Sequence, residues 1–81
     1  MRVLYFSWLR ERVGAASEEI ETDAATAGEL VRDLVARDAR YAAAFNDLRA
    51  LRVAVDQEMA DLDTPIAGAR EVAFFPPVTG G

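Results

Sequence analysis

The segment that decides the fold is residues 26–37, which read TAGELVRDLVAR. Thr26 and Glu29 have the spacing of a capping box, in which the threonine hydroxyl accepts a backbone N–H and the glutamate reaches back toward the cap. Apolar residues then recur at helical spacing, at Ala27, Leu30, Val31, Leu34 and Val35. The segment predicts one amphipathic helix of about three turns, and its apolar face requires a sheet to cover.

Short segments on both sides of this helix have the composition and alternation of β-strands. They are residues 3–8 (VLYFSW), 18–22 (EEIET), 51–55 (LRVAV) and 71–75 (EVAFF). Residues 41–45 are a candidate short second helix, and we expect polar turns over residues 56–63. This order predicts an α+β fold of the β-grasp, or ubiquitin-like, type, with a mixed four- to five-stranded sheet packed on one main helix.

Length and composition limit the chain to one small domain. It has 81 residues, of which 52% are hydrophobic, so there is room for a single modest core. We expect a β-grasp domain over residues 1–75 and an extended C-terminal tail over residues 76–81. No apolar run approaches the roughly 18 to 20 residues that span a bilayer, and no leader pattern begins the sequence, so we expect a cytoplasmic protein.

The charge and the missing residue types exclude several classes of function. The net charge is −5, with fourteen acidic residues against nine arginines, which disfavours nucleic acid and anionic membranes as partners. The sequence has no cysteine and no histidine, which removes disulfides, thiolate metal sites and the usual general base at neutral pH. We therefore expect no bound metal, no bound cofactor and no catalysis by the chain alone.

The C-terminal tail, PPVTGG, is suited to delivering a terminal carboxylate into another protein. Its two prolines favour an extended chain, and the terminal glycines fit a narrow channel. A carboxylate is a poor electrophile, so its use requires activation, most simply as an acyl-adenylate that another enzyme forms from ATP. We expect Gly81 to carry the reacting carbon, and the tail-docking residues to be Pro76, Pro77, Val78, Thr79 and Gly80.

The segment EVAFFPPVTGG at residues 71–81 resembles the C-terminal signature of the small subunit of molybdopterin synthase, a sulfur carrier. The resemblance continues over VLYF at residues 3–6, Arg10-Glu11 with Gly14, and VAV at residues 53–55. The turns depart from the family pattern at Asp56, where asparagine is frequent, and at Ala69-Arg70, where glycine and aspartate are frequent.

This resemblance implies a sulfur-transfer cycle in which partners supply the catalytic groups. A ubiquitin-activating-like adenylyltransferase would consume ATP to adenylate Gly81, and a sulfurtransferase system would convert the adenylate into a C-terminal thiocarboxylate. The tail would then enter the molybdopterin synthase large subunit and donate sulfur to cyclic pyranopterin monophosphate, which forms molybdopterin. The resemblance also implies a heterotetramer with two small subunits.

Strand alternation predicts an apolar surface for the partner. If side chains 3, 5, 72 and 74 face the helix, then Leu4, Phe6 and Phe75 face away from it, where a monomer normally carries polar groups. The resemblance places Phe6, Met59 and Phe75 in a hydrophobic patch at the partner interface. The alternative is a register shifted by one residue, which would make Phe6 and Phe75 ordinary core residues.

Two other classes of function stay open. A related sulfur carrier for thiamin or cysteine synthesis would share the fold and the terminal Gly-Gly, but it usually lacks the Phe-Phe-Pro-Pro run. A β-grasp protein modifier, or a plain interaction module, would share the fold as well.

Overall fold

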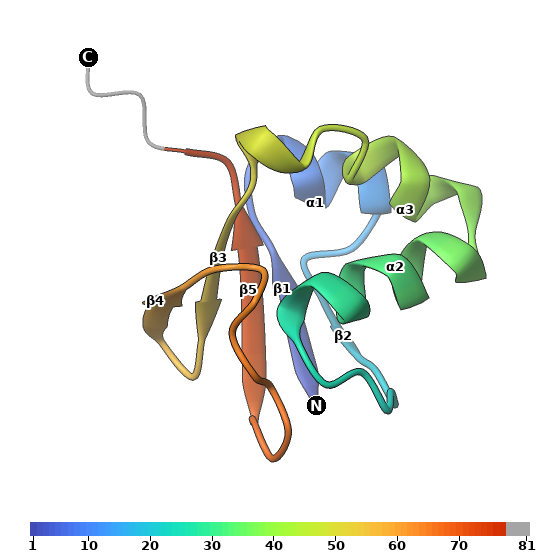
Figure 1. Ribbon diagram of the computed structural model, residues 1–81. Coiled ribbons are helices and arrows are strands. Elements are labelled where there is room, and N and C mark those ends of the chain that lie inside the picture. Colours follow the sequence, from blue (N-terminus) through green and yellow to red (C-terminus); the bar gives the residue numbers. More distant parts are fainter. Residues whose placement is uncertain (78–81) are drawn as a thin grey trace.

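The structure, a computed structural model, describes residues 1–77 (Figure 1). The elements follow in the order β1 (Arg2–Tyr5), α1 (Trp8–Val13), β2 (Ser17–Glu19), α2 (Ala27–Arg37), α3 (Ala39–Ala44), the 3₁₀ helix η1 (Leu48–Ala50), β3 (Arg52–Val55), β4 (Glu58–Ala60) and β5 (Glu71–Phe75). Within these residues the strands form one five-stranded sheet, ordered β2-β1-β5-β3-β4. The predicted β-grasp fold is confirmed, including the strands near 51–55 and 71–75 and the short second helix.

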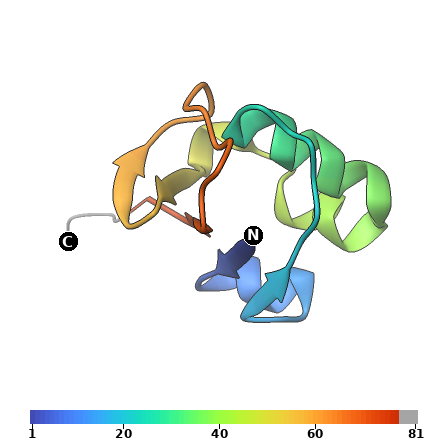
Figure 2. The ribbon, with the colours of Figure 1, turned by 90° about the horizontal axis from the view of Figure 1, so that it is seen from below.

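The sheet is mixed, with its one parallel pair at the centre of the described strands. β1 and β5 run parallel, which places Val3 beside Val72 and Tyr5 beside Phe74, and the remaining neighbours pair antiparallel. Viewed along the strands, α2 and α3 lie on one side of the sheet (Figure 2). The first and last strands therefore lie side by side, and both reach their C-terminal ends at the same end of the sheet.

Helix α2 begins at the predicted capping box. The N–H of Glu29 donates to Thr26 Oγ1 at 3.2 Å, and Glu29 Oε2 accepts the N–H of Ala25 at 3.0 Å. The apolar residues at positions 27, 30, 31 and 34 are buried, but Val35 is 36% exposed. The buried stripe of the helix is thus narrower than the apolar sequence pattern, because Val35 lies at its margin.

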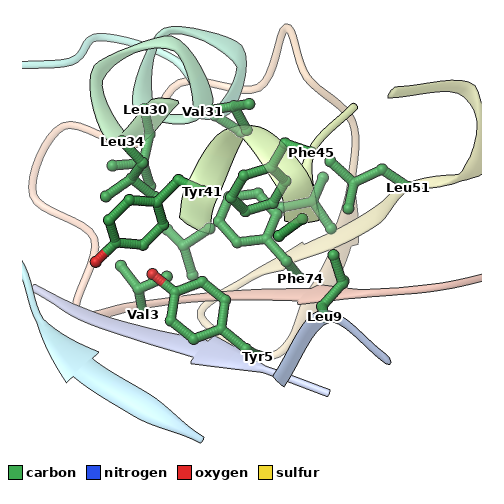
Figure 3. Packing of buried hydrophobic residues seen from close by; sticks show 14 of the residues in the cluster. Val3, Tyr5, Leu9, Leu30, Val31, Leu34, Tyr41, Phe45, Leu51 and Phe74 are labelled. Atoms are coloured by element: carbon green, nitrogen blue, oxygen red, sulfur yellow. The ribbon is translucent and has the colours of Figure 1, made fainter. Parts of the chain in front are cut away.

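The core between the sheet and the helices is built around aromatic rings (Figure 3). Phe45 and Phe74 meet edge to face with centroids 5.1 Å apart, and Tyr5 stacks on Phe74 at 6.5 Å. The ring of Tyr41 lies 6.4 Å from the ring of Tyr5. All four side chains are buried. Because aromatic side chains bury large areas, this cluster joins β1 and β5 to α3 and to the residue that follows it.

The first predicted strand is shorter than expected, because the chain turns at Ser7. β1 ends at Tyr5, and Trp8 begins helix α1. Ser7 has φ 57° and ψ −134°, a conformation that residues with a Cβ rarely adopt. Leu9 and Val13, four positions apart in α1, are buried. The strand prediction for residues 6–8 is wrong because a short apolar run suits a buried helix as well as a strand.

The segment predicted to form polar turns contains the edge strand β4. Asp56 and Gln57 have φ values of 49° and 70°, so the chain reverses within two residues and Met59 pairs with β3. Positive φ at both central positions is typical of a type I′ hairpin. Asp-Gln is a weaker hairpin signal than Asn-Gly, which is why the sequence predicted only a loop. β2 is also shorter than the predicted strand at 18–22.

Tyr5 carries a polar atom into the core. Its hydroxyl is buried near Glu18 and Tyr41 but makes no hydrogen bond of acceptable geometry within residues 1–77, whereas the Tyr41 hydroxyl donates to Glu18 Oε1 at 2.7 Å. Burial, reinforced by the negative charge of Glu18, raises the pKa of Tyr5 above its ordinary value. The Tyr5 ring therefore stabilises the core while its hydroxyl opposes burial.

We expect Tyr5→Phe to stabilise the fold by about 1 kcal/mol, because it removes an unpaired buried hydroxyl and keeps the ring. The gain should grow above a pH of about 10, the ordinary pKa of tyrosine. There the unfolded chain loses the Tyr5 proton while the folded chain keeps it, so the wild type loses stability as pH rises. Urea unfolding on both sides of this pH measures the effect.

Tyr41→Phe is the matched control for this experiment, because it removes a hydroxyl that is hydrogen-bonded to Glu18. We expect that variant to be less stable than the wild type at neutral pH. A Tyr5→Phe variant that loses stability to the same extent would show that the Tyr5 hydroxyl has a partner after all.

Candidate functional site

Strand alternation sorts the central residues onto two faces, as predicted. The side chains at positions 3, 5, 72 and 74 are at most 1% exposed, whereas Phe6 is 47% and Met59 is 68% exposed. Leu4 and Phe75 are half-buried. The predicted facing of Phe6 and Phe75 is confirmed, and the alternative register in which they are core residues is wrong.

The register of the strands brings the outward-facing apolar side chains together. The N–H of Phe6 donates to the Phe74 carbonyl at 3.1 Å, which extends the pairing of β1 with β5, so Phe6 lies next to Phe75. The row behind them crosses four strands through successive register partners, which are Leu4, Ala73, Ala54 and Met59. We call this row, together with Phe6 and Phe75, the docking face.

The docking face unites the three residues that the family resemblance placed at the partner interface, Phe6, Met59 and Phe75. Phe75 is the last residue of the central strand β5, Phe6 directly follows β1, and Met59 comes from the edge strand β4. Large apolar side chains gathered on an exposed sheet face are typical of a surface that another protein covers. The structure thus supplies the geometry of such a surface, and the interface role of these residues stays a prediction.

Two turns, which sequence reasoning did not assign to the site, set the borders of this face. Ser7, with its positive φ, turns the chain away from the sheet directly after Phe6. At the other turn, Asp56 Oδ1 accepts the N–H groups of Arg70 at 2.9 Å and Glu71 at 3.0 Å. Asp56 therefore ties the β3–β4 hairpin, and with it the strand that carries Met59, to the start of β5. Its signal in the sequence is an aspartate directly after an alternating strand, since aspartate tolerates positive φ and accepts nearby backbone N–H groups.

The C-terminal tail leaves the sheet at the docking face. β5 ends at Phe75, and Pro76 and Pro77 follow, both half-buried and outside regular secondary structure. Outside the described residues lie the other predicted tail positions, Val78, Thr79, Gly80 and Gly81. Their docking and chemical roles stay predictions. Phe75 belongs both to the docking face and to the last strand, so a partner that covers this face also meets the base of the tail.

Titratable groups with altered pKa lie away from the docking face. The Thr22 hydroxyl donates to Asp33 Oδ2 at 2.8 Å and lowers the pKa of Asp33, with a further contribution from Arg37. Burial, together with the hydrogen bond to Glu18, raises the pKa of Tyr41. Across residues 1–77 no group of three or more acidic side chains is placed to bind a metal ion.

The helices of the described residues are all too short or too polar to cross a membrane.

A β-grasp domain with an apolar sheet face beside the base of its C-terminal tail is, as a class, a ubiquitin-like protein. The chain belongs to the ThiS family, whose sequence pattern matches residues 3–81.

Comparison with individual proteins narrows this class. The chain is 41% identical over 81 residues to the molybdopterin synthase sulfur carrier subunit of Escherichia coli (strain K12), covering 100% of this chain and 99% of that protein. It is 36% identical, with the same coverage, to the protein of that name from Haemophilus influenzae. The crystal structure of SAMP1 from Haloferax volcanii matches with a TM-score of 0.78 and 30% identity, covering 100% of this chain and 98% of that chain. The resemblance to the molybdopterin synthase small subunit is confirmed.

We expect Asp56→Ala to lower the free energy of unfolding by about 1 to 2 kcal/mol, because it removes the acceptor of two backbone N–H groups. Asp56→Asn should retain most of the stability, since an amide oxygen can accept the same bonds and asparagine tolerates positive φ. Urea unfolding measures both variants.

Asp63→Ala serves as the control for Asp56, because the Asp63 carboxylate makes no hydrogen bond or ion pair among the described residues. If Asp56→Ala is no less stable than Asp63→Ala, the hydrogen bonds from Arg70 and Glu71 to the Asp56 carboxylate do not stabilise the hairpin.

Proposed function

We propose that the chain is the sulfur-carrier, or small, subunit of molybdopterin synthase and acts in molybdenum cofactor biosynthesis. The observation that carries this proposal is the 41% identity to a protein of that name over the full chain. The position of the docking face at the base of a tail that ends in Gly80-Gly81 supports it. A carrier of this kind acts in the cytoplasm and needs partner enzymes for every chemical step.

The docking face supports the synthase large subunit as the main partner. Phe6, Met59 and Phe75 supply large apolar side chains, and full burial of each contributes about 1.5 to 3 kcal/mol. A few such anchors near the centre of an interface can provide most of its binding energy. Association through this face would bring the tail to the large subunit. The large subunit could then recognise the domain without contacting the tail.

In the proposed cycle, activation takes place on another protein. A carboxylate oxygen of Gly81 attacks the α-phosphorus of ATP in a ubiquitin-activating-like adenylyltransferase, and pyrophosphate leaves. A sulfurtransferase system then delivers sulfur, at the oxidation level of sulfide, to the acyl carbon, and AMP leaves. The product is a C-terminal thiocarboxylate. The activating enzyme binds the ATP, and the carrier itself requires no cofactor.

Sulfur transfer would then occur inside the large subunit. The thiocarboxylate sulfur forms a carbon–sulfur bond with cyclic pyranopterin monophosphate in place of an oxygen substituent, which leaves. Water then cleaves the bond between this sulfur and the acyl carbon of Gly81, so the sulfur stays on the pterin and Gly81 returns to the carboxylate. In this cycle Gly80 leaves clearance around the acyl carbon, while the tail positions before it, 76–79, guide the chain into the large subunit. Each delivery supplies one sulfur, so the dithiolene of molybdopterin requires a second delivery, which suits a heterotetramer with two small subunits.

Two specific observations favour other candidates. The structure matched in Haloferax volcanii is that of small archaeal modifier protein 1, which supports a protein modifier joined to other proteins through Gly81. Membership of the ThiS family also leaves room for a sulfur carrier of thiamin or cysteine synthesis. Conjugates, or sulfur delivery to those pathways, would distinguish these candidates from the synthase subunit.

We expect incubation with the activating enzyme, ATP and a sulfur source to raise the intact mass of the chain by the difference between sulfur and oxygen. Mass spectrometry of the C-terminal peptide locates the change. Deletion of Gly81 is the control, since that variant should fold normally and gain no sulfur. The charged protein should then support molybdopterin formation with a large subunit and the pyranopterin, and a failure at this last step would exclude the pathway assignment.

We expect Phe75→Asp to weaken binding of the large subunit by at least about tenfold, because it places a carboxylate at the centre of an apolar contact. Val35→Asp is the matched control, since Val35 is also a partly exposed apolar residue but lies on α2. Calorimetric titration measures binding, and thermal unfolding shows whether each variant is folded. Equal effects of the two variants on affinity would rule out the docking face as the interface.

A further inference from the structure

A basic residue borders the docking face on the side where the tail leaves. Arg52, at the start of β3, pairs in register with Phe75, so the row nearest the tail reads Phe6, Phe75 and Arg52. The row behind it is apolar across its four strands. In the row farthest from the tail, Arg2 is already paired with Glu19 at 3.8 Å. Within β1, β3, β4 and β5 as bounded above, Arg52 is the one charge in the two rows nearest the tail, and the next residue after β4, Asp61, falls opposite it when the β3–β4 register is extended by one position.

Arg52 has no carboxylate partner among residues 1–77. Its side chain is exposed, and Nη1 donates to the carbonyl of Leu51 at 3.2 Å. Asp61, opposite Arg52 in the extended register, makes no ion pair with it among the described residues and accepts hydrogen bonds within its own turn instead. Its Oδ1 accepts the N–H of Asp63 at 2.8 Å and the hydroxyl of Thr64 at 3.3 Å. The guanidinium is thus available to a group from outside the chain.

Any protein that covers the docking face must accommodate this guanidinium. Register partners on adjacent strands have their Cβ atoms about 5 Å apart, so a surface that buries Phe75 also removes water from Arg52. A desolvated charge without a partner is strongly unfavourable, whereas a charge with a well-placed counter-ion is tolerated. We propose that Arg52 forms an ion pair with a carboxylate of the large subunit, beside the opening that receives the tail. This inference rests on the proposed function and specifies the chemistry of its interface.

The chemistry of arginine suits this position. Its planar guanidinium presents paired N–H donors that match the two oxygens of a carboxylate, which gives the contact a direction as well as a charge. The chain as a whole is negative, at −5, so the attraction of an acidic partner to Arg52 is local. On the far row the same partner carboxylate would meet Glu19 and Glu71. The pair therefore selects one orientation of the partner on the docking face, the one that aligns its opening with the tail.

The test compares the affinity of the wild type, Arg52→Glu and Arg52→Lys for the large subunit from the same organism. Arg52→Glu should weaken binding about 10- to 100-fold, and the loss should shrink as salt screens the charges. Arg52→Lys should lose less, because it keeps the charge but not the paired donors. Arg32→Glu is the matched control: it makes the same change in net charge at an exposed position of α2, and it should bind as the wild type does.

The outcomes distinguish a failure of the proposed ion pair from a failure of the proposed function. If the wild type does not bind the large subunit, both the proposed function and the ion pair are overturned. If the wild type binds and Arg52→Glu binds as well as Arg32→Glu, only the ion pair is overturned. Thermal unfolding verifies that Arg52→Glu is folded, and Arg52→Gln, which removes the charge without reversing it, provides a second reading with a smaller loss of affinity.

Discussion

The parallel pairing of β1 with β5 is the constraint on which the rest of the molecule depends. It sets Val3 against Val72 and Tyr5 against Phe74, and because side chains alternate along a strand, one register decides both faces of the sheet. The inner face receives the aromatic core that α2 and α3 cover. The outer face receives Phe6 and Phe75, which become neighbours because parallel strands end at the same end of the sheet.

An exposed apolar face adds no stability to a small domain in water, so the core on the other face must supply the stability of the fold. The core provides this through the aromatic cluster of Tyr5, Phe45 and Phe74. The turns at Ser7 and Asp56 bound the outer face at two ends, and both use backbone conformations with positive φ. Such conformations are maintained only where surrounding contacts determine them. For Asp56 those contacts are hydrogen bonds to the start of β5, so the geometry of the face follows from the same central strand.

The parts of the fold that the sequence predicts well are those whose signal is local. The capping box and apolar spacing locate α2, and alternation gives the facing of Phe6 and Phe75. Helix α1 and strand β4 were missed because neither has a local signal strong enough to identify it. α1 exists because Leu9 and Val13 reach a core that other elements build, and β4 exists because a two-residue turn returns the chain to β3. Arg52 was overlooked as part of the candidate site for the same reason, since its position beside Phe75 depends on the pairing of β3 with β5.

The point where the tail leaves the sheet limits the partners that can use it. Residues 76–81 reach at most about 20 Å when fully extended, so an enzyme that acts on Gly81 must place its reactive centre within that distance of Phe75. Proline at 76 and 77 narrows the directions available, which lowers the entropy lost when the tail enters a channel. Since Phe6 and Arg52 flank Phe75, an enzyme that approaches the base of the tail from the outer face of the sheet also covers part of the docking face. The surface around the base of the tail can therefore contribute to the choice of the enzymes that act on Gly81.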